Sequence, residues 1–225
     1  KDIRREEQSV GIGVKVKVLE EAGIPIDYIA GTSMGSLVGA LYAIGYDAHT
    51  MDSLVRRQNW TFLLSDKVYR YNLPFSEKEE TEKYLVSVPI KNNREIKIPS
   101  GFISGQNIYN LFSDLTIGYH DSLDFKKLPI PFACVASNLV DGQEVIQDCG
   151  VLPLAMRASM AIPGAFAPVR KDGMVLVDGG ISNNFPVDIA KAMGADIIIG
   201  VDVQAELKDA SGLESVMGIL DQMTS

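Results

Sequence analysis

An uncharged stretch of 19 residues, Tyr28 to Tyr46, constrains this sequence more than any other feature. By length alone such a stretch can span a lipid bilayer. Its first part, Ala30 to Ser36, however, holds three hydroxyl groups and two glycines, whose polar groups would be costly in lipid. The stretch therefore predicts a buried strand from Tyr28, a tight turn over Gly31–Gly35 and a buried helix that ends at Gly45.

Apolar runs alternate with helical patterns along most of the chain, which is typical of βα units and predicts an α/β fold with a mainly parallel sheet. We expect one domain over residues 1–225, with residues 1–16 left unassigned. Asp141-Gly142 predicts a hairpin, because that dipeptide tolerates the positive φ angles of a tight turn. The other predicted strands are Phe132–Ala136, Met174–Val177 and Asp196–Asp202; the other predicted helices are residues 14–22 with Gly23 at the C′ position, Leu152–Ala161, a helix from Pro186 to Gly194, and Leu213–Met223.

Asp47 to Leu128 is the least regular part of the sequence. It is interpreted either as an insertion that covers a site or as peripheral helices. Its charged run from Glu77 to Lys83 is assigned to a solvated helix face.

The charge balance narrows the classes of partner. The chain has 21 Lys and Arg against 29 Asp and Glu, a net charge of −8, and no cluster of basic residues. Because proteins neutralise phosphates with clustered basic side chains, we expect no nucleic-acid partner. With 46% apolar residues the chain can bury a sizeable core, and its two cysteines, Cys134 and Cys149, are too few for a disulfide framework or a metal site.

Gly31-Thr32-Ser33-Met34-Gly35 matches the pattern G-x-S-x-G between a predicted strand and a predicted helix. In that context Gly31 and Gly35 permit a sharp turn that holds Ser33 exposed at the start of the helix. The helix dipole and the free N–H of Met34 can stabilise an oxyanion there. A plain tight turn is the alternative, but the context favours Ser33 as a nucleophile.

A serine nucleophile needs a base, and the sequence offers two histidines. His49 lies beyond the helix that follows Ser33, about 18 Å away if that helix has about 12 residues. His120 lies in a polar loop, with no carboxylate placed to orient it. We therefore expect both histidines to be surface residues rather than members of a triad.

A carboxylate is the remaining candidate base. Asp178 ends a predicted buried strand and is followed by Gly179-Gly180. Because sites in parallel sheets gather at the carboxyl ends of the strands, we expect Asp178 to meet Ser33 at one sheet edge, where it could take the serine proton. A turn Asp that caps a helix is the alternative, and both interpretations stay open at this point. Asp202, also at a predicted strand end, is a weaker candidate because no glycine pair follows it.

Three motifs in this order resemble the bacterial patatin-like phospholipases, over a span from about Lys17 to Val203. They are Gly31-Thr-Ser-Met-Gly35, Arg157-Ala-Ser-Met-Ala-Ile-Pro-Gly-Ala-Phe-Ala-Pro168 and Val177-Asp-Gly-Gly-Ile-Ser-Asn-Asn-Phe-Pro186. The resemblance implies a three-layer α/β/α patatin-like fold and a Ser–Asp dyad, with Ser33 as nucleophile and Asp178 as general base. It also implies hydrolysis of lipid acyl esters, as by a phospholipase A or lysophospholipase, without a metal or organic cofactor.

The resemblance also sets expectations about partners. It implies a lipid or phospholipid substrate and transient contact with a membrane surface. It includes the branch fused to an outer-membrane barrel, and so favours a bacterial, exported or outer-membrane-associated protein over a cytoplasmic one. Two alternatives stay open: a general esterase or thioesterase, and a non-catalytic lipid-binding or interaction domain. The segment Met160 to Ala167 is a candidate lining for an acyl pocket, with packing against the strands as the alternative.

One departure from the family concerns its glycine-rich oxyanion loop, of the form G-G-G-x-[KR]-G. At the corresponding place Gly11-Ile-Gly13 lacks the third glycine and the basic residue. The expected first strand abuts the first helix with no room to turn, so we expect that a loop is missing from this sequence. A chain that truly lacked it would lose oxyanion donors, each worth about 3 kcal/mol.

Overall fold

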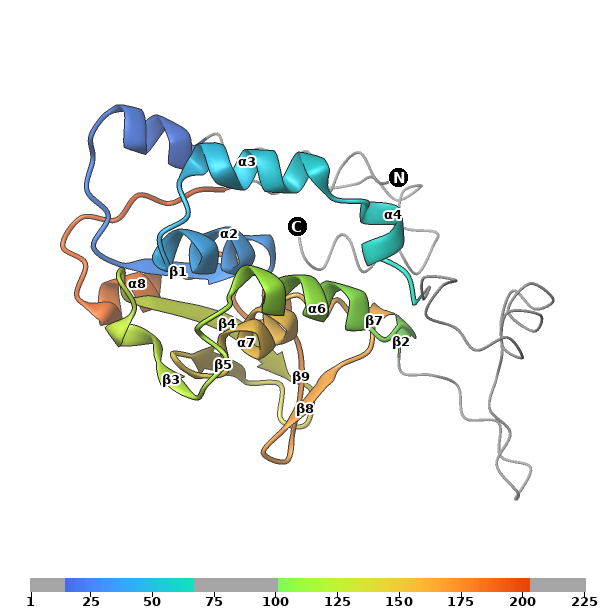
Figure 1. Ribbon diagram of the computed structural model, residues 1–225. Helices are drawn as coiled ribbons and strands as arrows, with labels where there is room; N and C mark the ends of the chain where they lie inside the picture. Colours follow the sequence, from blue (N-terminus) through green and yellow to red (C-terminus); the bar gives the residue numbers. More distant parts are fainter. Residues whose placement is uncertain (1–14, 67–100, 203–225) are drawn as a thin grey trace, which may run out of the picture.

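A computed structural model describes residues 15–66 and 101–202 (Figure 1). A helix over residues 15–21 comes first. The strands are β1 (Ile29–Thr32), β2 (Gly101–Ile103), β3 (Leu123–Asp124), β4 (Phe132–Asn138), β5 (Glu144–Gln147), β6 (Cys149–Gly150), β7 (Gly164–Phe166), β8 (Val169–Lys171) and β9 (Met174–Asp178). The helices are α2 (Met34–Ala43), α3 (Ala48–Arg57), α4 (Trp60–Leu63), α6 (Gln106–Leu115), α7 (Leu152–Ser159) and α8 (Val187–Met193), with 3-10 turns at Phe125–Lys127 and Gly179–Ile181.

Strand β4 lies at the centre of the main sheet, which has five strands among the described residues. Strand β5 pairs with it over Cys134 to Ser137 and fills one of its edges there. Strand β1 pairs with residues 132–135 of β4 and β9 with residues 136–138, so both must lie along the opposite edge. Since β1 runs parallel to β4 and β9 antiparallel, the two strands point toward each other and their carboxyl ends meet.

The sheet is mixed, which corrects the prediction of a mainly parallel one. Among the described strands of this sheet only the β1–β4 pairing is parallel; β4–β5, β4–β9 and β8–β9 are antiparallel. The predicted hairpin at Asp141-Gly142 is confirmed, and it joins β4 to β5. A second Asp-Gly pair, Asp172-Gly173, joins β8 to β9 with both residues at positive φ, a turn signal that the sequence analysis missed.

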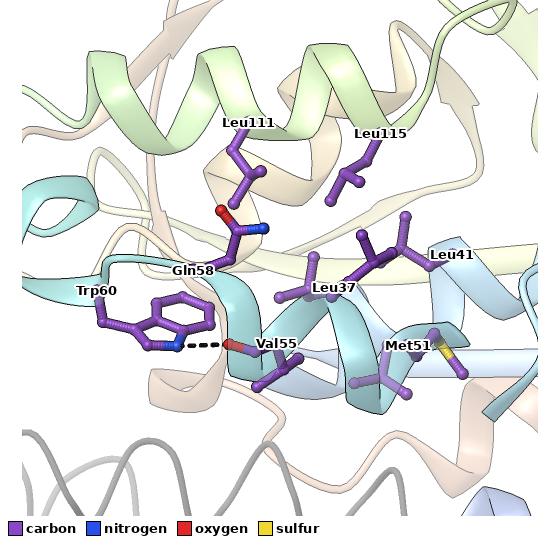
Figure 2. Close-up of a pocket in the computed structure, with 10 residues that line it drawn as sticks. Leu37, Leu41, Met51, Val55, Gln58, Trp60, Leu111 and Leu115 are labelled. Carbon is purple, nitrogen blue, oxygen red and sulfur yellow. Dashed lines mark hydrogen bonds between the residues drawn. The ribbon is translucent and has the colours of Figure 1, made fainter. Parts of the chain in front are cut away.

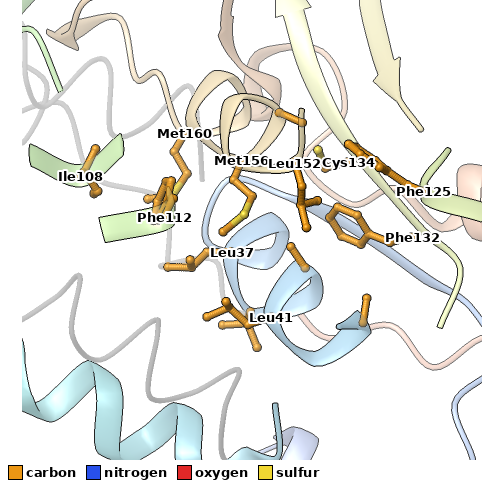
Figure 3. Packing of buried hydrophobic residues seen from close by; sticks show 14 of the residues in the cluster. Leu37, Leu41, Ile108, Phe112, Phe125, Phe132, Cys134, Leu152, Met156 and Met160 are labelled. Atoms are coloured by element: carbon orange, nitrogen blue, oxygen red, sulfur yellow. The ribbon is translucent and has the colours of Figure 1, made fainter. Parts of the chain in front are cut away.

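Helices cover both faces of the sheet, so the predicted α/β/α layering is confirmed. Alternate residues of β4 face opposite layers. Phe132 and Cys134 belong to the main core with α2, α6 and α7 (Figure 3). Ala133 and Val135 pack with Ile189 of α8 on the other face.

Local signals in the sequence place several elements correctly. The uncharged stretch forms β1, the turn and α2, as predicted. Gly23 ends the first helix at φ 67°, with its N–H donating to the Glu20 carbonyl and that of Ile24 to Leu19. Helix α8 begins after Pro186 and ends at Gly194. No helix within the described ranges is both long enough and apolar enough to cross a membrane.

Two groups of predictions fare differently. The apolar run Asp196 to Asp202 was predicted as a buried strand, and this is wrong: it joins no described strand, and Ile197 is 85% exposed. The apolar residues favoured a buried strand, but an apolar run does not determine whether another strand lies beside it for backbone hydrogen bonding. The expected first strand, the charged run from Glu77 and the helix Leu213–Met223 lie outside the described residues.

The reactivity of the two cysteine thiols can test whether β4 is buried. Cys134 is fully buried, and burial raises the pKa of its thiol to about 12, whereas Cys149 is exposed. Because the thiolate is the reactive form, we expect a disulfide reagent to modify one thiol in the native protein and both in denaturant.

A disulfide reagent that releases a coloured thiolate for each thiol it modifies measures the number of reactive cysteines directly. The Cys149→Ser variant serves as the control and should show no fast native reaction. Two fast-reacting thiols in the native wild-type protein would contradict the buried position of β4.

Candidate active site

Ser33 lies in a strained turn between β1 and α2. Its backbone has φ 53° and ψ −119°, a conformation that side-chain-bearing residues rarely adopt. Gly31 makes the turn possible, because a Cβ there would lie 2.4 Å from the carbonyl oxygen of Gly35. At Gly35 itself a Cβ would meet nothing within 4 Å. Of the two motif glycines, only Gly31 is therefore required by packing.

Asp178, the last residue of β9, lies beside this turn and is fully buried. The Ser33 Oγ hydroxyl donates a hydrogen bond to Asp178 Oδ2 at 2.7 Å. The other oxygen, Oδ1, accepts the N–H of Gly180 at 2.8 Å and caps the 3-10 turn that follows. The geometry thus shows a hydrogen bond for each interpretation: Oδ2 lies within reach of the Ser33 hydroxyl, and Oδ1 caps the turn.

The strand pairing explains why these two side chains meet across 145 positions of sequence. Thr32 pairs with Val135 of β4, and Asp178 pairs with the next residue, Ala136. The predicted meeting of Ser33 and Asp178 is therefore found, but the reason given for it was wrong. The strands β1 and β9 are not parallel neighbours; they approach end to end along one edge of β4.

Gly179 and Gly180 allow the chain to turn tightly after Asp178. A Cβ on Gly179 would lie 2.3 Å from the carbonyl oxygen of Val135. A Cβ on Gly180 would lie 3.1 Å from Asp178 Oδ1 and crowd the carboxylate. The absence of side chains at both positions therefore lets the acid approach Ser33 closely.

Three hydroxyl groups hold the backbone of the turn. Ser159, the fully buried last residue of α7, accepts the N–H of Ser33 on its Oγ at 3.0 Å. Ser36 donates its hydroxyl to the carbonyl of Ser33, and Thr32 donates to the carbonyl of Asn183. None of these residues was predicted from the sequence to have a role, although Ser159 and Asn183 lie inside the second and third motifs.

The other candidate residues lie elsewhere. His49 and His120 are exposed, as predicted, and His120 Nε2 bonds with the carbonyl of Ser113. Asp202 is exposed at the end of the misassigned strand. Met34 is the first residue of α2, and helix geometry leaves its N–H without an acceptor inside the helix. The Gly11-Ile-Gly13 segment lies outside the described residues.

This arrangement can perform one kind of chemistry. A hydroxyl that donates to a buried carboxylate can pass its proton to it and become a nucleophile. The N–H at the start of α2 lies next to that hydroxyl in sequence, where an oxyanion would form during attack on a carbonyl. Across the described residues, no group of three or more His, Cys, Asp and Glu side chains is placed to hold a metal ion.

Comparisons with known proteins find a matching family model and several similar sequences. Residues 11–191 match the family model described as patatin-like phospholipase. Lysophospholipase nte1 of Aspergillus niger is 32% identical over 192 residues, which cover 85% of this chain and 11% of the relative. Patatin-like phospholipase domain-containing protein 6 of Mus musculus is 31% identical over 198 residues, 87% of this chain and 12% of the relative. The chain thus spans about a tenth of the length of these curated relatives.

Among solved structures, a crystal structure of VipD from Legionella pneumophila is similar to the chain. It is 15% identical with a TM-score of 0.48, and the match covers 87% of this chain and 46% of that one.

The packing of the turn predicts different effects on stability for substitutions of its two glycines. The Gly31→Ala substitution forces a methyl group against the Gly35 carbonyl, so we expect it to lower the free energy of unfolding by about 3 kcal/mol. Gly35→Ala meets open space inside α2, where Ala is the better helix former, and should raise the free energy of unfolding by up to about 1 kcal/mol. Urea unfolding of both variants measures the contrast, and equal losses would contradict the described packing of α2 on β1.

A second prediction concerns the hydrogen bond that Ser159 accepts from the N–H of Ser33. In Ser159→Ala the half-buried N–H of Ser33 loses its acceptor, which costs about 1 kcal/mol and loosens the strained turn. We expect the rate at which a fluorophosphonate modifies Ser33 to fall about tenfold or more, measured by intact mass spectrometry over time.

The control for Ser159 is Thr116→Val. Thr116 is also fully buried, and its hydroxyl donates to the Phe112 carbonyl rather than to the turn. This variant should lose stability and keep the wild-type rate of modification. Equal rates in wild type and Ser159→Ala would remove Ser159 from the site.

Proposed function

The chain belongs to the patatin-like phospholipase family, and from this premise we propose that it is a lipid acyl hydrolase with a Ser33–Asp178 dyad. The observation that carries the proposal is the 2.7 Å hydrogen bond from Ser33 Oγ to Asp178 Oδ2. Ser33 gives its proton to Asp178 as Oγ attacks the carbonyl carbon of an ester. The N–H of Met34 is one donor to the resulting oxyanion.

The reaction then proceeds through an acyl-enzyme. The tetrahedral intermediate collapses, the carbon–oxygen bond to the leaving alcohol breaks, and protonated Asp178 returns its proton to that alcohol. Asp178 next takes a proton from water as the water oxygen attacks the Ser33 ester. The bond between the acyl carbon and Ser33 Oγ then breaks, Asp178 returns the proton to Oγ, and a fatty acid is released. The protons and the acyl group are exchanged only among Ser33, Asp178, the substrate and water, so the proposed reaction needs no cofactor.

The substrate class is proposed from the relatives. The fungal relatives are named lysophospholipases, so we propose the carboxylic ester of a lysophospholipid as the substrate to test first. A lipid substrate implies transient contact with a membrane surface. The bacterial, exported location and the neighbouring outer-membrane barrel stay predictions from the sequence alone.

The dyad is tested by removing the proton acceptor while keeping its shape. In Asp178→Asn the side-chain oxygen can still accept the Gly180 N–H, but the amide cannot take a proton from Ser33. We expect fatty acid release from lysophosphatidylcholine to fall about 10³-fold, with an unchanged circular dichroism spectrum. Ser33→Ala should lose the fluorophosphonate adduct altogether.

The matched control is Asp196→Asn, which changes an exposed carboxylate and should keep wild-type turnover. Substantial turnover in Asp178→Asn would overturn the dyad. Cleavage of short-chain esters or thioesters without cleavage of lysophospholipid would favour the general esterase. No turnover and no adduct in the wild-type protein would favour the non-catalytic alternative.

A further inference from the structure

Arg157, the first residue of the second sequence motif, is the one basic residue that is buried among the described residues. It lies in the last turn of α7 and is 4% exposed. Removal from water lowers the pKa of its guanidinium, and the charge of Asp66 offsets part of this effect. Its Nη1 nitrogen has no hydrogen-bond partner within the described ranges. Because a buried cation with an unpartnered nitrogen costs free energy, stability alone gives no reason for an arginine here.

The guanidinium of Arg157 joins α7 to a second, two-stranded sheet. Its Nη2 donates one hydrogen bond to the carbonyl of Ser104 and one to the carbonyl of Ala167, each at 2.9 Å. Ser104 directly follows β2 and Ala167 directly follows β7, and these two strands pair with each other. The Arg157 Cζ also lies 5.0 Å from the centre of the Phe166 ring, a cation–π contact. Arg157 therefore fastens the end of α7 to β2 and β7.

The chain around Ser104 is shaped to receive the guanidinium. Gly105 has φ 78°, and a Cβ at this position would overlap the guanidinium of Arg157. Asp66 accepts the N–H of Ser104 at 2.8 Å and its hydroxyl at 2.6 Å. Asp66 thus holds the residue whose carbonyl binds Arg157, and its negative charge favours the charged form of the arginine. The position of Arg157 is therefore fixed from three separate segments of the chain.

The chain that leaves α7 is bonded to the backbone of both dyad residues. Ser159 Oγ accepts the N–H of Ser33 at 3.0 Å. Two residues later, the carbonyl of Ala161 accepts the N–H of Asp178, also at 3.0 Å. The segment from Ser159 to Ala161 therefore bridges the ends of β1 and β9, in addition to the pairing of these strands with β4. Arg157 lies only two residues before this segment.

We propose that Arg157 is a positioning residue, which fixes the end of α7 and through it the distance between the two dyad residues. Its effect on the reaction rests on the proposed function, whereas its effect on the backbone does not. The same segment, Met160 to Ala167, was a candidate lining for an acyl pocket. Ala161 and Phe166 are instead packed in the interior, as the packing alternative expects.

Arg157→Met in the full chain provides the first test, because methionine is long and apolar but donates no hydrogen bond. We expect the N–H groups of Ser33 and Asp178 to exchange with deuterium about tenfold or more faster than in the wild type, as measured by NMR. The N–H groups of β5, on the other edge of β4, should exchange at nearly the wild-type rate. Unchanged exchange at Ser33 and Asp178, or equal acceleration in β5, would overturn the proposal.

The reactivity of the nucleophile provides the second test. We expect the rate at which a fluorophosphonate modifies Ser33 to fall about tenfold or more in Arg157→Met. Arg157→Lys should recover part of this loss, because its ammonium group can donate to the same two carbonyls. A rate in Arg157→Lys no higher than that in Arg157→Met would overturn the proposal.

Two controls separate positioning from loss of stability. Thr116→Val removes a buried hydroxyl that donates to the Phe112 carbonyl, so it should lower stability and change neither the exchange at Ser33 nor its modification. Trp60, the only tryptophan of the chain, lines an apolar pocket with Val55 and Leu111 (Figure 2). Its emission spectrum should be the same in every variant as in the wild type if these helices stay folded.

A further variant covers the case in which Arg157→Met does not fold. Gly105→Ala keeps the arginine but places a methyl group against its guanidinium, so it should displace Arg157. We expect faster exchange at Ser33 and Asp178 in this variant as well. Wild-type exchange in Gly105→Ala would overturn the proposal.

The exchange and modification rates separate the two proposals. Faster exchange at Ser33 in Arg157→Met, in a protein whose wild type forms no adduct and cleaves no ester, supports the positioning role and overturns the proposed function. An adduct in the wild type with unchanged exchange in Arg157→Met overturns the positioning role and leaves the hydrolase. Faster exchange together with slower modification supports both.

Discussion

The hydrogen bond between Ser33 and Asp178 depends on how two strands share one edge of β4. Strand β1 arrives parallel to β4 and stops at Thr32, and β9 arrives from the opposite direction and stops at Asp178. Their partners on β4 are adjacent residues, so the two chain ends are held a few ångströms apart by backbone ladders rather than by side chains. The rest of the site is built around this meeting point.

The close approach of these two chain ends leaves no room for side chains at the neighbouring glycines. Gly31 lets α2 begin directly above β1, and Gly179 lets the chain after β9 pass the backbone of β4. The buried carboxylate of Asp178 accepts a hydrogen bond on each oxygen, which offsets the cost of removing it from water. The strained backbone of Ser33 is held in place by two hydrogen bonds. Ser159 accepts its N–H, and Ser36 donates to its carbonyl.

Helix α2 fixes the turn at Ser33 to the core of the protein. Its first residue is Met34, directly after Ser33, and its next two turns bury Leu37 and Leu41 in the main core. Gly39 on another face packs against Ile29 and Phe132, where a Cβ would lie 2.8 Å from the Ile29 side chain. The position of the turn at Ser33 therefore depends on the packing of α2 against the sheet.

The sequence by itself determined the features that depend on neighbouring residues. Glycines that end helices, Asp-Gly pairs that turn hairpins, and a Ser between two glycines after a strand all act through local backbone conformation, so Gly23, Asp141-Gly142 and the turn at Ser33 could be predicted. Pairing partners could not be predicted, because the ladders of β9 and the exposure of Ile197 depend on what lies across the sheet. Only the tertiary structure decided that β9 runs antiparallel to β4 and that Ser159 holds the turn. These are contacts between segments far apart in sequence, and no local pattern of residues encodes which segments will meet.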